Sequence, residues 1–379
     1  MKALFYLGMA GLFLFELLSV YLIMPMPGSQ ELDSVDFAYF LYQWRWVFRL
    51  AFAGIALAGL VGIIRKPHRW IPLMLTLLIP AALIAYIHFR LSADQMFHQP
   101  DQVKLVPQHE NKVALNRLVV GITLGKESRA YPIQYLAYHH QVRDTIGATL
   151  LMVTYCSVCR TGRVYAAQVD GEPATFRLVG MTHYNALFED EHTGNWWQQS
   201  SGEAIEGPKK GAYLVAIPSE QMTLKQWLAL HPASLILQGD PVYDPKYRKD
   251  LAYEEGTSRD ALTGTDSTSW KNKSWIVGIT SGITSKAYDW NRLKRERIIN
   301  DMIGNTPVVL VLARDNASFV AYQRPDRNAT FRVQNDSLVS NGITYDLAGR
   351  SVKGRLRALP ASQEFWHSWR TIHPKTQLY

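Results

Sequence analysis

Apolar side chains dominate three runs in the first quarter of the chain, residues 4–24, about 44–64 and 70–89. Each run is close to the ~20 residues that an α-helix needs to cross the hydrocarbon core of a bilayer. Lys2 precedes the first run, as in a secretory signal, but the apolar stretch is long and no small-residue cleavage site follows it. The pattern therefore predicts a three-helix transmembrane anchor over residues 1–91.

From residue 92 onward the pattern changes to short runs rich in β-branched and aromatic residues, such as RLVVGI, TLLMVTY and ATFRLVG, bounded by Gly, Asp or Pro. Such runs are typical of β-strands. A helix is indicated where Thr223 and Gln226 have the spacing of a capping box and Pro232 follows at the other end. We expect a β-rich α+β soluble region.

The soluble region contains two similar halves. VGITLGKESRAY at 120–131 matches VGITSGITSKAY at 277–288, and VRDTIGATLLMV at 142–153 matches INDMIGNTPVVL at 299–310. Each half then closes on a Trp-x-x-x-His-Pro signature. Self-similarity in a fixed order indicates duplication, so we predict two pseudo-symmetric repeats. The expected segments are the anchor 1–91, a first repeat 92–239 with the cysteine site, a connecting loop 240–272, and a second, degenerate repeat 273–379.

The basic residues predict the orientation of the anchor. The short loop 65–69 reads RKPHR, whereas the loop after the first apolar run carries three acidic residues and no Lys or Arg before Arg45. Because basic loops stay on the cytoplasmic side, the loop 65–69 and Lys2 are expected inside. Three crossings of a bacterial inner membrane then deliver the soluble region to the periplasm. Arg45 and Arg49, near the outer end of the second helix, run against this orientation.

The net charge of +8 is spread along the chain, and no base-stacking motif accompanies it. A basic balance of this kind fits a membrane protein that also meets anionic lipid. We therefore expect inner-membrane lipid as a partner and no nucleic acid.

The two halves differ in the residues that carry chemistry. Both cysteines of the chain, Cys156 and Cys159, lie in the first half, and Ala313 takes the place of Cys156 in the second. After the shared tetrapeptide ATFR, the first half is eight residues longer and holds two histidines and two tryptophans. The set found only in the first half is Cys156, Cys159, Arg160, His183, His192, Trp196 and Trp197. The pairs expected to be structural, because both halves share them, are Tyr131/Tyr288 and Asp144/Asp301. A single site would accordingly lie in the first repeat.

A soft-metal site is the first prediction for this set. Two thiolates two residues apart can reach one ion, and zinc or copper takes thiolate and imidazole ligands. The predicted ligands are Cys156, Cys159, His183 and His192. The role would be binding or delivery of copper or zinc.

Two alternatives stay open at the level of sequence. Cys156 and Cys159 could form the dithiol of a periplasmic thiol–disulfide oxidoreductase, with Arg160 lowering the thiol pKa. However, a thioredoxin-like pair opens a helix, and here the strand-like RVYAAQV follows. The second alternative is a non-catalytic interaction module, whose partner would be another protein of a membrane complex.

The motifs together resemble a bacterial family known as domain of unknown function 3179, over about residues 95–379. The resemblance rests on the VGI…G…AYP opening, the RD-x-x-G segment, the YCxxC turn, the W-x-Q…GEAI-x-GP stretch and the terminal HP. Family members usually show YCPLCGT at the turn, where this chain reads YCSVCRT, so that Arg160 stands in place of the Gly. The resemblance implies the architecture and no particular reaction.

Overall fold

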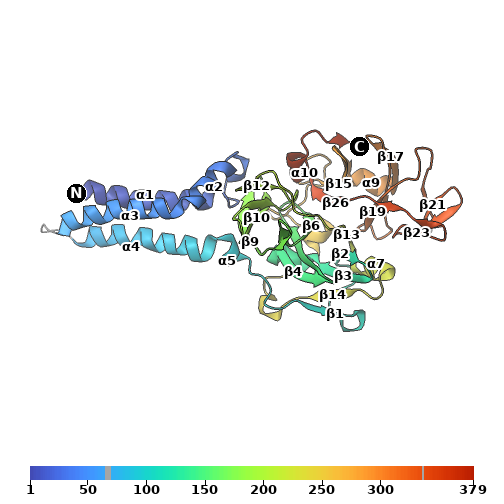
Figure 1. Ribbon diagram of the computed structural model, residues 1–379, viewed down its shortest axis with the longest axis horizontal. Coiled ribbons are helices and arrows are strands. Elements are labelled where there is room, and N and C mark those ends of the chain that lie inside the picture. Colours follow the sequence, from blue (N-terminus) through green and yellow to red (C-terminus); the bar gives the residue numbers. More distant parts are fainter. Residues whose placement is uncertain (65–69, 335–336) are drawn as a thin grey trace. The chain divides into compact units, whose positions relative to one another are not determined.

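The computed structural model describes residues 1–64, 70–334 and 337–379 (Figure 1). The predicted inner loop, 65–69, lies outside the described residues. The chain forms two compact units. The first comprises Met1–His98, Thr175–Gln198 and Glu203–Ala212; the second comprises Gln99–Ala174, Gln199–Gly202 and Tyr213–Tyr379. The bounds of these units differ from the segments predicted from the sequence. Residues 175–198 and 203–212 of the predicted first repeat pack with the helices.

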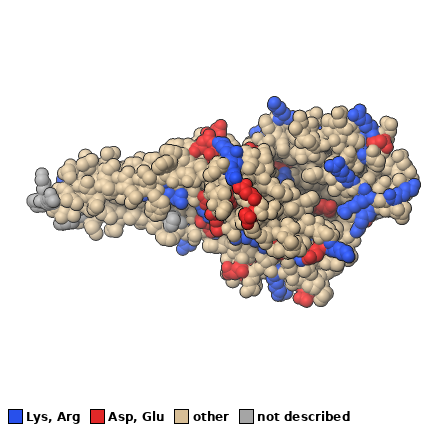
Figure 2. Space-filling model, in the orientation of Figure 1, with Lys and Arg blue, Asp and Glu red and all other residues tan. Residues whose placement is uncertain are grey.

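Three long helices confirm the predicted apolar runs. They are α1 (Lys2–Tyr21), α3 (Arg45–Ile64) and α4 (Trp70–Tyr86), the last continued by a π-helical turn, η2 (Ile87–Leu91). All three are long and apolar enough to cross a membrane, and the face drawn in Figure 2 carries few charged side chains along them. A Cβ at Gly8 or Gly59 would clash with the facing helix, α3 or α1. Small residues thus allow these two backbones to approach closely.

Shorter elements complete the first unit. Between α1 and α3 lie η1 (Ser29–Glu31) and α2 (Val35–Gln43), and after α4 comes α5 (Ala93–Met96). An antiparallel sheet in the order β12-β11-β10-β9 packs with them. Its strands are β9 (Phe176–Thr182), β10 (Asn185–Asp190), β11 (Trp196–Gln198) and β12 (Ala204–Glu206).

The second unit begins with a five-stranded sheet in the order β1-β14-β3-β2-β13 and a three-stranded sheet β4-β5-β6. The strands of the first sheet are β1 (Lys104–Val106), β2 (Leu118–Leu124), β3 (Glu127–Pro132), β13 (Ser219–Thr223) and β14 (Leu235–Gln238). The second sheet contains β4 (Gln141–Ile146), β5 (Thr149–Cys156) and β6 (Thr161–Ala166). The helices are α6 (Ile133–His139) and α7 (Leu224–Leu230). Thr223 caps α7 by accepting a hydrogen bond from the Gln226 amide, as the capping box predicts.

The rest of the second unit has two four-stranded sheets, β26-β15-β16-β27 and β17-β18-β19-β25. Their main strands are β15 (Trp275–Ser281), β16 (Thr284–Asp289), β17 (Ile298–Ile303), β18 (Thr306–Leu312), β19 (Phe319–Gln323) and β26 (Ala361–Phe365). The short strands are β25 (Arg357–Ala358) and β27 (Gln377–Leu378). The helices are α9 (Trp290–Glu296) and α10 (Trp366–Ile372). A small sheet of β20 (Arg332–Gln334), β21 (Ser337–Ser340) and β22 (Ile343–Tyr345) lies beside them.

One order of elements occurs twice in the second unit. The hairpin β2–β3, helix α6 and hairpin β4–β5 are followed later by the hairpin β15–β16, helix α9 and hairpin β17–β18. The same hydrogen bond lies in each: Tyr131 donates to Asp144 at 2.5 Å, and Tyr288 donates to Asp301 at 2.9 Å. The two Tyr–Asp pairs thus join the corresponding hairpins in the same way.

The segment 240–272, predicted as a connecting loop, also contributes buried residues to the second unit. It contains little regular structure, namely η4 (Pro241–Tyr243) and α8 (Ala252–Glu255). However, Tyr253 and Glu254 of α8 are buried. Glu254 pairs with the buried Arg117 at 3.0 Å and accepts a hydrogen bond from the Leu118 amide at 2.6 Å. A buried charge is tolerated when it is paired and hydrogen-bonded, so Tyr253 and Glu254 of α8 are part of the packed interior.

Candidate functional site: the Cys156–Cys159 turn

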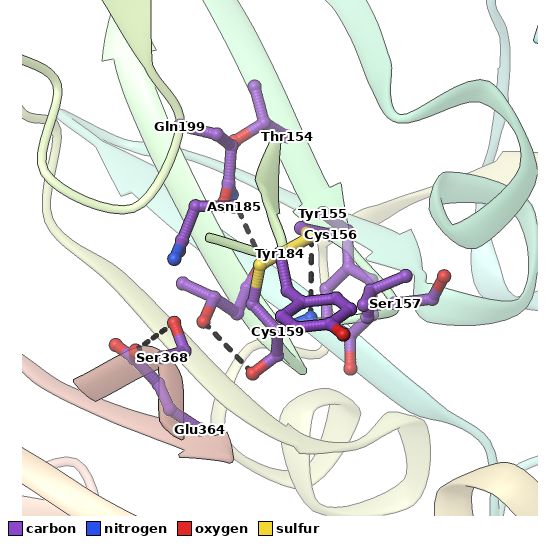
Figure 3. Close-up of a disulfide and its surroundings, with 12 residues drawn as sticks. Thr154, Tyr155, Cys156, Ser157, Cys159, Tyr184, Asn185, Gln199, Glu364 and Ser368 are labelled. Carbon is purple, nitrogen blue, oxygen red and sulfur yellow. Dashed lines mark hydrogen bonds between the residues drawn. A yellow bond between two sulfur atoms is a disulfide. The ribbon is translucent and has the colours of Figure 1, made fainter. Parts of the chain in front are cut away.

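The two cysteines form a disulfide in the tight turn that joins β5 to β6 (Figure 3). Their Cα atoms are 5.4 Å apart, and neither residue has solvent-exposed surface. The amide of Cys159 also points to Sγ of Cys156, at 3.4 Å. The turn continues into a strand, so the helix that stabilises thiolates in thioredoxin-like sites does not follow it. Both sulfurs are thus bonded to each other inside the second unit.

Arg160 has the left-handed backbone conformation, with φ of 59°. A Gly would adopt it without strain, whereas an L side chain pays about 1–2 kcal/mol. Arg160 is completely buried, and its guanidinium donates to Gln363 at 2.9 Å, to the Tyr253 carbonyl at 2.8 Å and to the Glu254 carbonyl at 2.9 Å. It also lies over the Trp275 ring, 3.6 Å from the centroid. These contacts hold the turn in a backbone conformation that Gly adopts more readily than Arg.

The carbonyl groups of the turn accept hydrogen bonds from the last third of the chain. Val158 O receives Lys273 Nζ at 3.0 Å and lies 3.2 Å from His367 Nε2. Cys159 O receives the Phe365 amide at 2.9 Å. Burial lowers the pKa of Lys273 to about 8, and burial together with nearby Lys273 lowers the pKa of His367 to about 3. His367 is therefore neutral at pH 7, and its proton must be on Nε2 to donate to the carbonyl.

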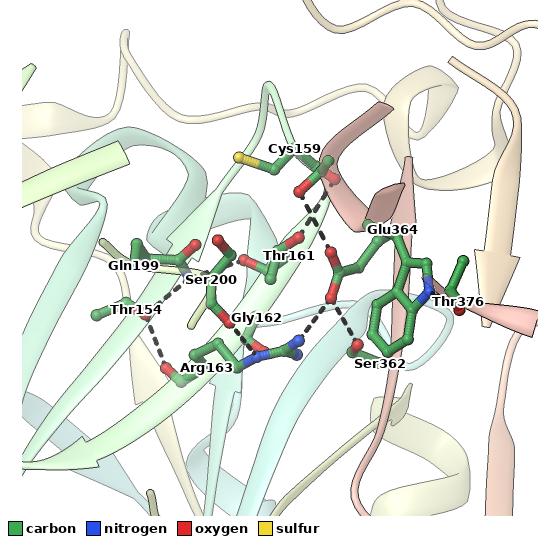
Figure 4. A network of polar contacts seen from close by, with 12 residues as sticks. Thr154, Cys159, Thr161, Gly162, Arg163, Gln199, Ser200, Ser362, Glu364 and Thr376 are labelled. Carbon is green, nitrogen blue, oxygen red and sulfur yellow. Dashed lines mark hydrogen bonds and ion pairs between the residues drawn. The ribbon is translucent and has the colours of Figure 1, made fainter. Parts of the chain in front are cut away.

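A buried carboxylate lies in the same region (Figure 4). Glu364 is 1% exposed, and it accepts hydrogen bonds from Arg163 at 2.5 Å, Ser362 at 2.7 Å and Ser368 at 3.2 Å. Arg163 also donates to the Ser200 carbonyl at 3.0 Å. These three partners all belong to the second unit, so the network ties β6 to β26 and α10.

Gln199 spans the strands on either side of the disulfide turn. Its amide nitrogen donates to Thr154 Oγ1 at 2.8 Å and to the Thr161 carbonyl at 3.0 Å. Its Oε1 is buried and has no hydrogen-bond partner among the described residues. Gln199 therefore braces the strand ends that hold the cysteines.

The two predicted histidine ligands belong to the first unit, whereas both cysteines belong to the second. His183 lies in the β9–β10 turn, where its Nδ1 is 3.2 Å from the Gln30 carbonyl. His192 is exposed in the turn between β10 and β11. Within residues 1–64, 70–334 and 337–379, no group of three or more His, Cys, Asp or Glu side chains is placed to hold a metal ion. The structure therefore brings together Cys156 and Cys159 of the predicted ligand set.

The two tryptophans found only in the first half also pack within the first unit. Trp196 is fully buried and makes an edge contact with Tyr39 of α2, with 5.1 Å between ring centroids. Trp197 donates from Nε1 to Asp190 at 2.8 Å. The longer segment of the first half therefore builds the sheet β9–β12, and these tryptophans are part of its packing.

Sequence reasoning missed the residues that reach the turn from elsewhere: Tyr253, Lys273, Gln363, Glu364 and His367. Apart from the aromatic cluster FWHSW around His367, no motif signals them. Their contacts arise only once the second half folds against the first.

The chain belongs to the family described as protein of unknown function (DUF3179), whose model matches residues 98–376. This confirms the resemblance seen in the motifs. No curated protein and no solved structure matches the chain.

Proposed function

We propose that the chain is a non-catalytic module of the bacterial inner membrane, with the soluble region in the periplasm and the Cys156–Cys159 disulfide as a structural element. The observation that carries this proposal is the state of the two sulfurs: they are bonded to each other and without exposed surface. Buried structural cysteines are inert, while reactive ones are partly exposed. The module would hold a partner protein of a membrane complex.

Duplication is part of the proposal. The recurring hairpin–helix–hairpin order and the paired Tyr–Asp hydrogen bonds support it. A further match is a glycine packed against a Trp ring in each half. A Cβ at Gly121 would clash with Trp227, and a Cβ at Gly278 would clash with Trp369. Both tryptophans come from the Trp-x-x-x-His-Pro signatures.

The sheet β9–β12 supports an anchoring role for the segment found only in the first half. The Met181 amide donates to the Ile23 carbonyl at 2.7 Å, and Tyr42 Oη donates to Glu189 at 3.0 Å. Burial of Trp196 between β-strands and α2 adds apolar contact. The segment found only in the first half thus forms a sheet that packs against the helices.

Two observations support the periplasmic orientation. Arg49 pairs with Glu16 of α1 through two hydrogen bonds of 2.6 and 3.0 Å. Arg49 lies inside α3 and is paired with Glu16, so we assign it to the packing of the anchor and not to the loops whose basic residues set the orientation. A disulfide also forms and persists in the periplasm and is rare in the cytosol.

Thiol–disulfide exchange is the second candidate, and the cations around the turn favour it. Arg160, Arg163 and Lys273 would stabilise a thiolate at this place. In that reaction a partner thiolate would attack one Sγ, the other Sγ would leave as a thiolate, and a second partner thiol would resolve the mixed disulfide. The partner would lose two electrons and the Cys156–Cys159 pair would gain them. The turn would first have to open, because both sulfurs are buried.

Copper or zinc binding stays a prediction. It requires the reduced pair, since a metal ligand is the thiolate. His183 and His192 remain the imidazoles proposed to join it.

A trapping experiment separates these functions. Cys159→Ser and Cys156→Ser would each be expressed as the full chain in a bacterial inner membrane, and mixed disulfides would be sought on non-reducing gels. The structural proposal expects none, and it expects the double variant to fold with stability reduced by about 2 kcal/mol, the loop-entropy value for so short a ring. A partner held covalently by one single variant would instead establish exchange. Stoichiometric copper or zinc in the reduced wild type, absent from the double variant, would establish metal binding.

A further inference from the structure

We propose that α2 lies in the membrane–water interface, with its exposed aromatic ridge inserted among the lipid headgroups and upper acyl chains. The ridge consists of Phe37, Phe40 and Trp44. This inference rests on the proposed membrane anchor, because it needs α3 to cross a bilayer. It adds to the anchor a lipid contact surface that adjoins α3 and is distinct from the three spans.

Two faces of α2 have different surroundings. Ala38 and Leu41 are each 4% exposed and belong to the core shared with β9, β10 and β11. Phe37 and Phe40 are 47% exposed and Trp44 is 54% exposed. Their spacing of three and four residues places them on one side of a helix. The helix is therefore apolar on a buried face and again on an exposed one.

The ridge is continuous along the helix. The ring centroids of Phe37 and Phe40 are 6.4 Å apart, and those of Phe40 and Trp44 are 6.5 Å apart. Phe40 also makes an edge contact with Phe48 of α3 at 6.0 Å. The aromatic surface thus leads without interruption from α2 to the candidate span.

The surface of α3 next to the ridge is also apolar and exposed. Trp46, Val47 and Leu50 are 63%, 54% and 71% exposed, as expected of side chains that face lipid. Trp44 directly precedes α3, so the ridge lies at the level where the span begins. Tryptophan and other aromatic rings are enriched at that level in membrane proteins. This continuity commits the ridge to lipid as its occupant.

Polar groups beside the ridge fit the headgroup region. Arg45 donates to the Tyr42 carbonyl at 2.6 Å, and its guanidinium lies 4.0 Å from the centroid of the Tyr42 ring. Asp36 pairs with Lys210 at 2.8 Å on the sheet side of α2. Charged groups can extend to the interface while the rings remain among the chains. Since β9–β12 packs on the buried face of the same helix, insertion of α2 would fix this sheet at the membrane surface.

Depth-dependent quenching tests the proposal on the full chain in lipid nanodiscs. Phe40→Cys and Phe37→Cys would each be labelled with the fluorophore NBD, while the native cysteines remain oxidised. Gln43→Cys, an exposed polar position on the same helix, is the matched control, and Leu50→Cys reports the span. We expect the two ridge labels to lose fluorescence with nitroxides near the headgroup and to resist aqueous iodide. The Gln43 label should be quenched by iodide.

Several outcomes are distinguishable. Ridge labels quenched by iodide and unaffected by lipid nitroxides would place the ridge in water and overturn the proposal. Ridge labels protected from both quenchers would place it against protein, including a second copy, and would also overturn it. A Leu50 label that no lipid nitroxide quenches would overturn the membrane anchor itself.

Discussion

Arg160 is hydrogen-bonded to Tyr253, which lies 93 residues further along the chain: its guanidinium donates to the Tyr253 carbonyl at 2.8 Å. The first residue follows the disulfide, and the second lies between the two halves of the soluble region. Tyr253 in turn donates from its hydroxyl to the Ser157 carbonyl at 3.1 Å. The turn and the connecting segment therefore hold each other, and the shape of the cysteine turn depends on a distant segment.

Arg160→Ala should be strongly destabilising, because it removes three hydrogen bonds of a buried guanidinium, deprives the Glu254 carbonyl of its Arg160 donor and keeps a strained backbone. Loss of hydrogen bonds to a charged group costs about 1.5–3 kcal/mol each. Arg160→Gly should lose the same contacts but be about 1 kcal/mol less destabilised, since Gly accepts φ > 0. Chemical unfolding of the purified full chain measures both.

Arg259→Ala, at an exposed position of the same connecting segment, is the control and should be neutral. Equal stabilities for Arg160→Ala and Arg160→Gly would refute the strain argument.

The buried histidines predict a loss of stability in acid. Burial lowers the pKa of His367 to about 3, and it lowers those of His140 and His231 to about 4. Between these values and the unfolded value near 6.5, the unfolded state binds more protons than the folded state. Stability should therefore fall as pH falls from about 6.5 toward 3.

His367→Gln should reduce the pH slope of the unfolding free energy, because it removes one titrating group and keeps a donor. His109→Gln, whose side chain is 79% exposed, should leave the slope unchanged. The slope is read from urea titrations at several pH values, and an unaltered slope in His367→Gln would argue against a buried neutral imidazole.

The buried Lys273 predicts that stability increases in alkaline solution. Burial lowers its pKa to about 8 from 10.5, so the unfolded state binds the extra proton between these values. Below about pH 8 the buried charge of Lys273 lowers the free energy of unfolding by its full amount. The free energy of unfolding therefore rises as pH increases from about 8 toward 10.5. Lys273→Arg keeps the charge at all these pH values and should abolish this rise, which the same titrations would detect.

The paired tyrosines should behave alike. Tyr131→Phe and Tyr288→Phe each remove a hydrogen bond to a carboxylate, with an expected loss of about 1.5–3 kcal/mol. Ile283→Val, at an exposed position in the turn after β15, should leave the free energy of unfolding unchanged. A large effect in one half and none in the other would contradict the equivalent roles of the two pairs.

Docking of the sheet on the helices depends on Gly180 and Trp196. A Cβ at Gly180 would clash with the Ile23 carbonyl, so Gly180→Ala should separate β9 from the segment after α1. Trp196→Ala should remove about 3–5 kcal/mol of packing. Protease cleavage within residues 175–212 should accelerate in both variants and stay slow in Trp44→Ala, whose side chain is exposed.

The sequence predicts well what depends on local pattern. The three apolar helices follow from composition alone, and the cap at Thr223 follows from a side chain three residues from its partner. Strands β2, β5 and β9 follow from β-branched runs. The family assignment rests on motifs that are contiguous in the chain.

The sequence does not predict contacts made between distant segments. His183 belongs to the first unit, where its Nδ1 lies 3.2 Å from the Gln30 carbonyl, and no local pattern signals this contact. The residues found only in the first half have two separate roles: Arg160 holds the cysteine turn, and Trp196 packs in the core beside α2. Both kinds of residue are specific to one half, and only the fold distinguishes them.

The reduction potential of Cys156–Cys159 in the full-length protein tests the central claim most directly. It would be measured by equilibration with dithiol buffers and quantitation of the free thiols. We predict a value below about −300 mV, as for structural disulfides. A value between about −120 and −270 mV, the range of proteins that exchange disulfides, would contradict the account and make the turn a redox centre.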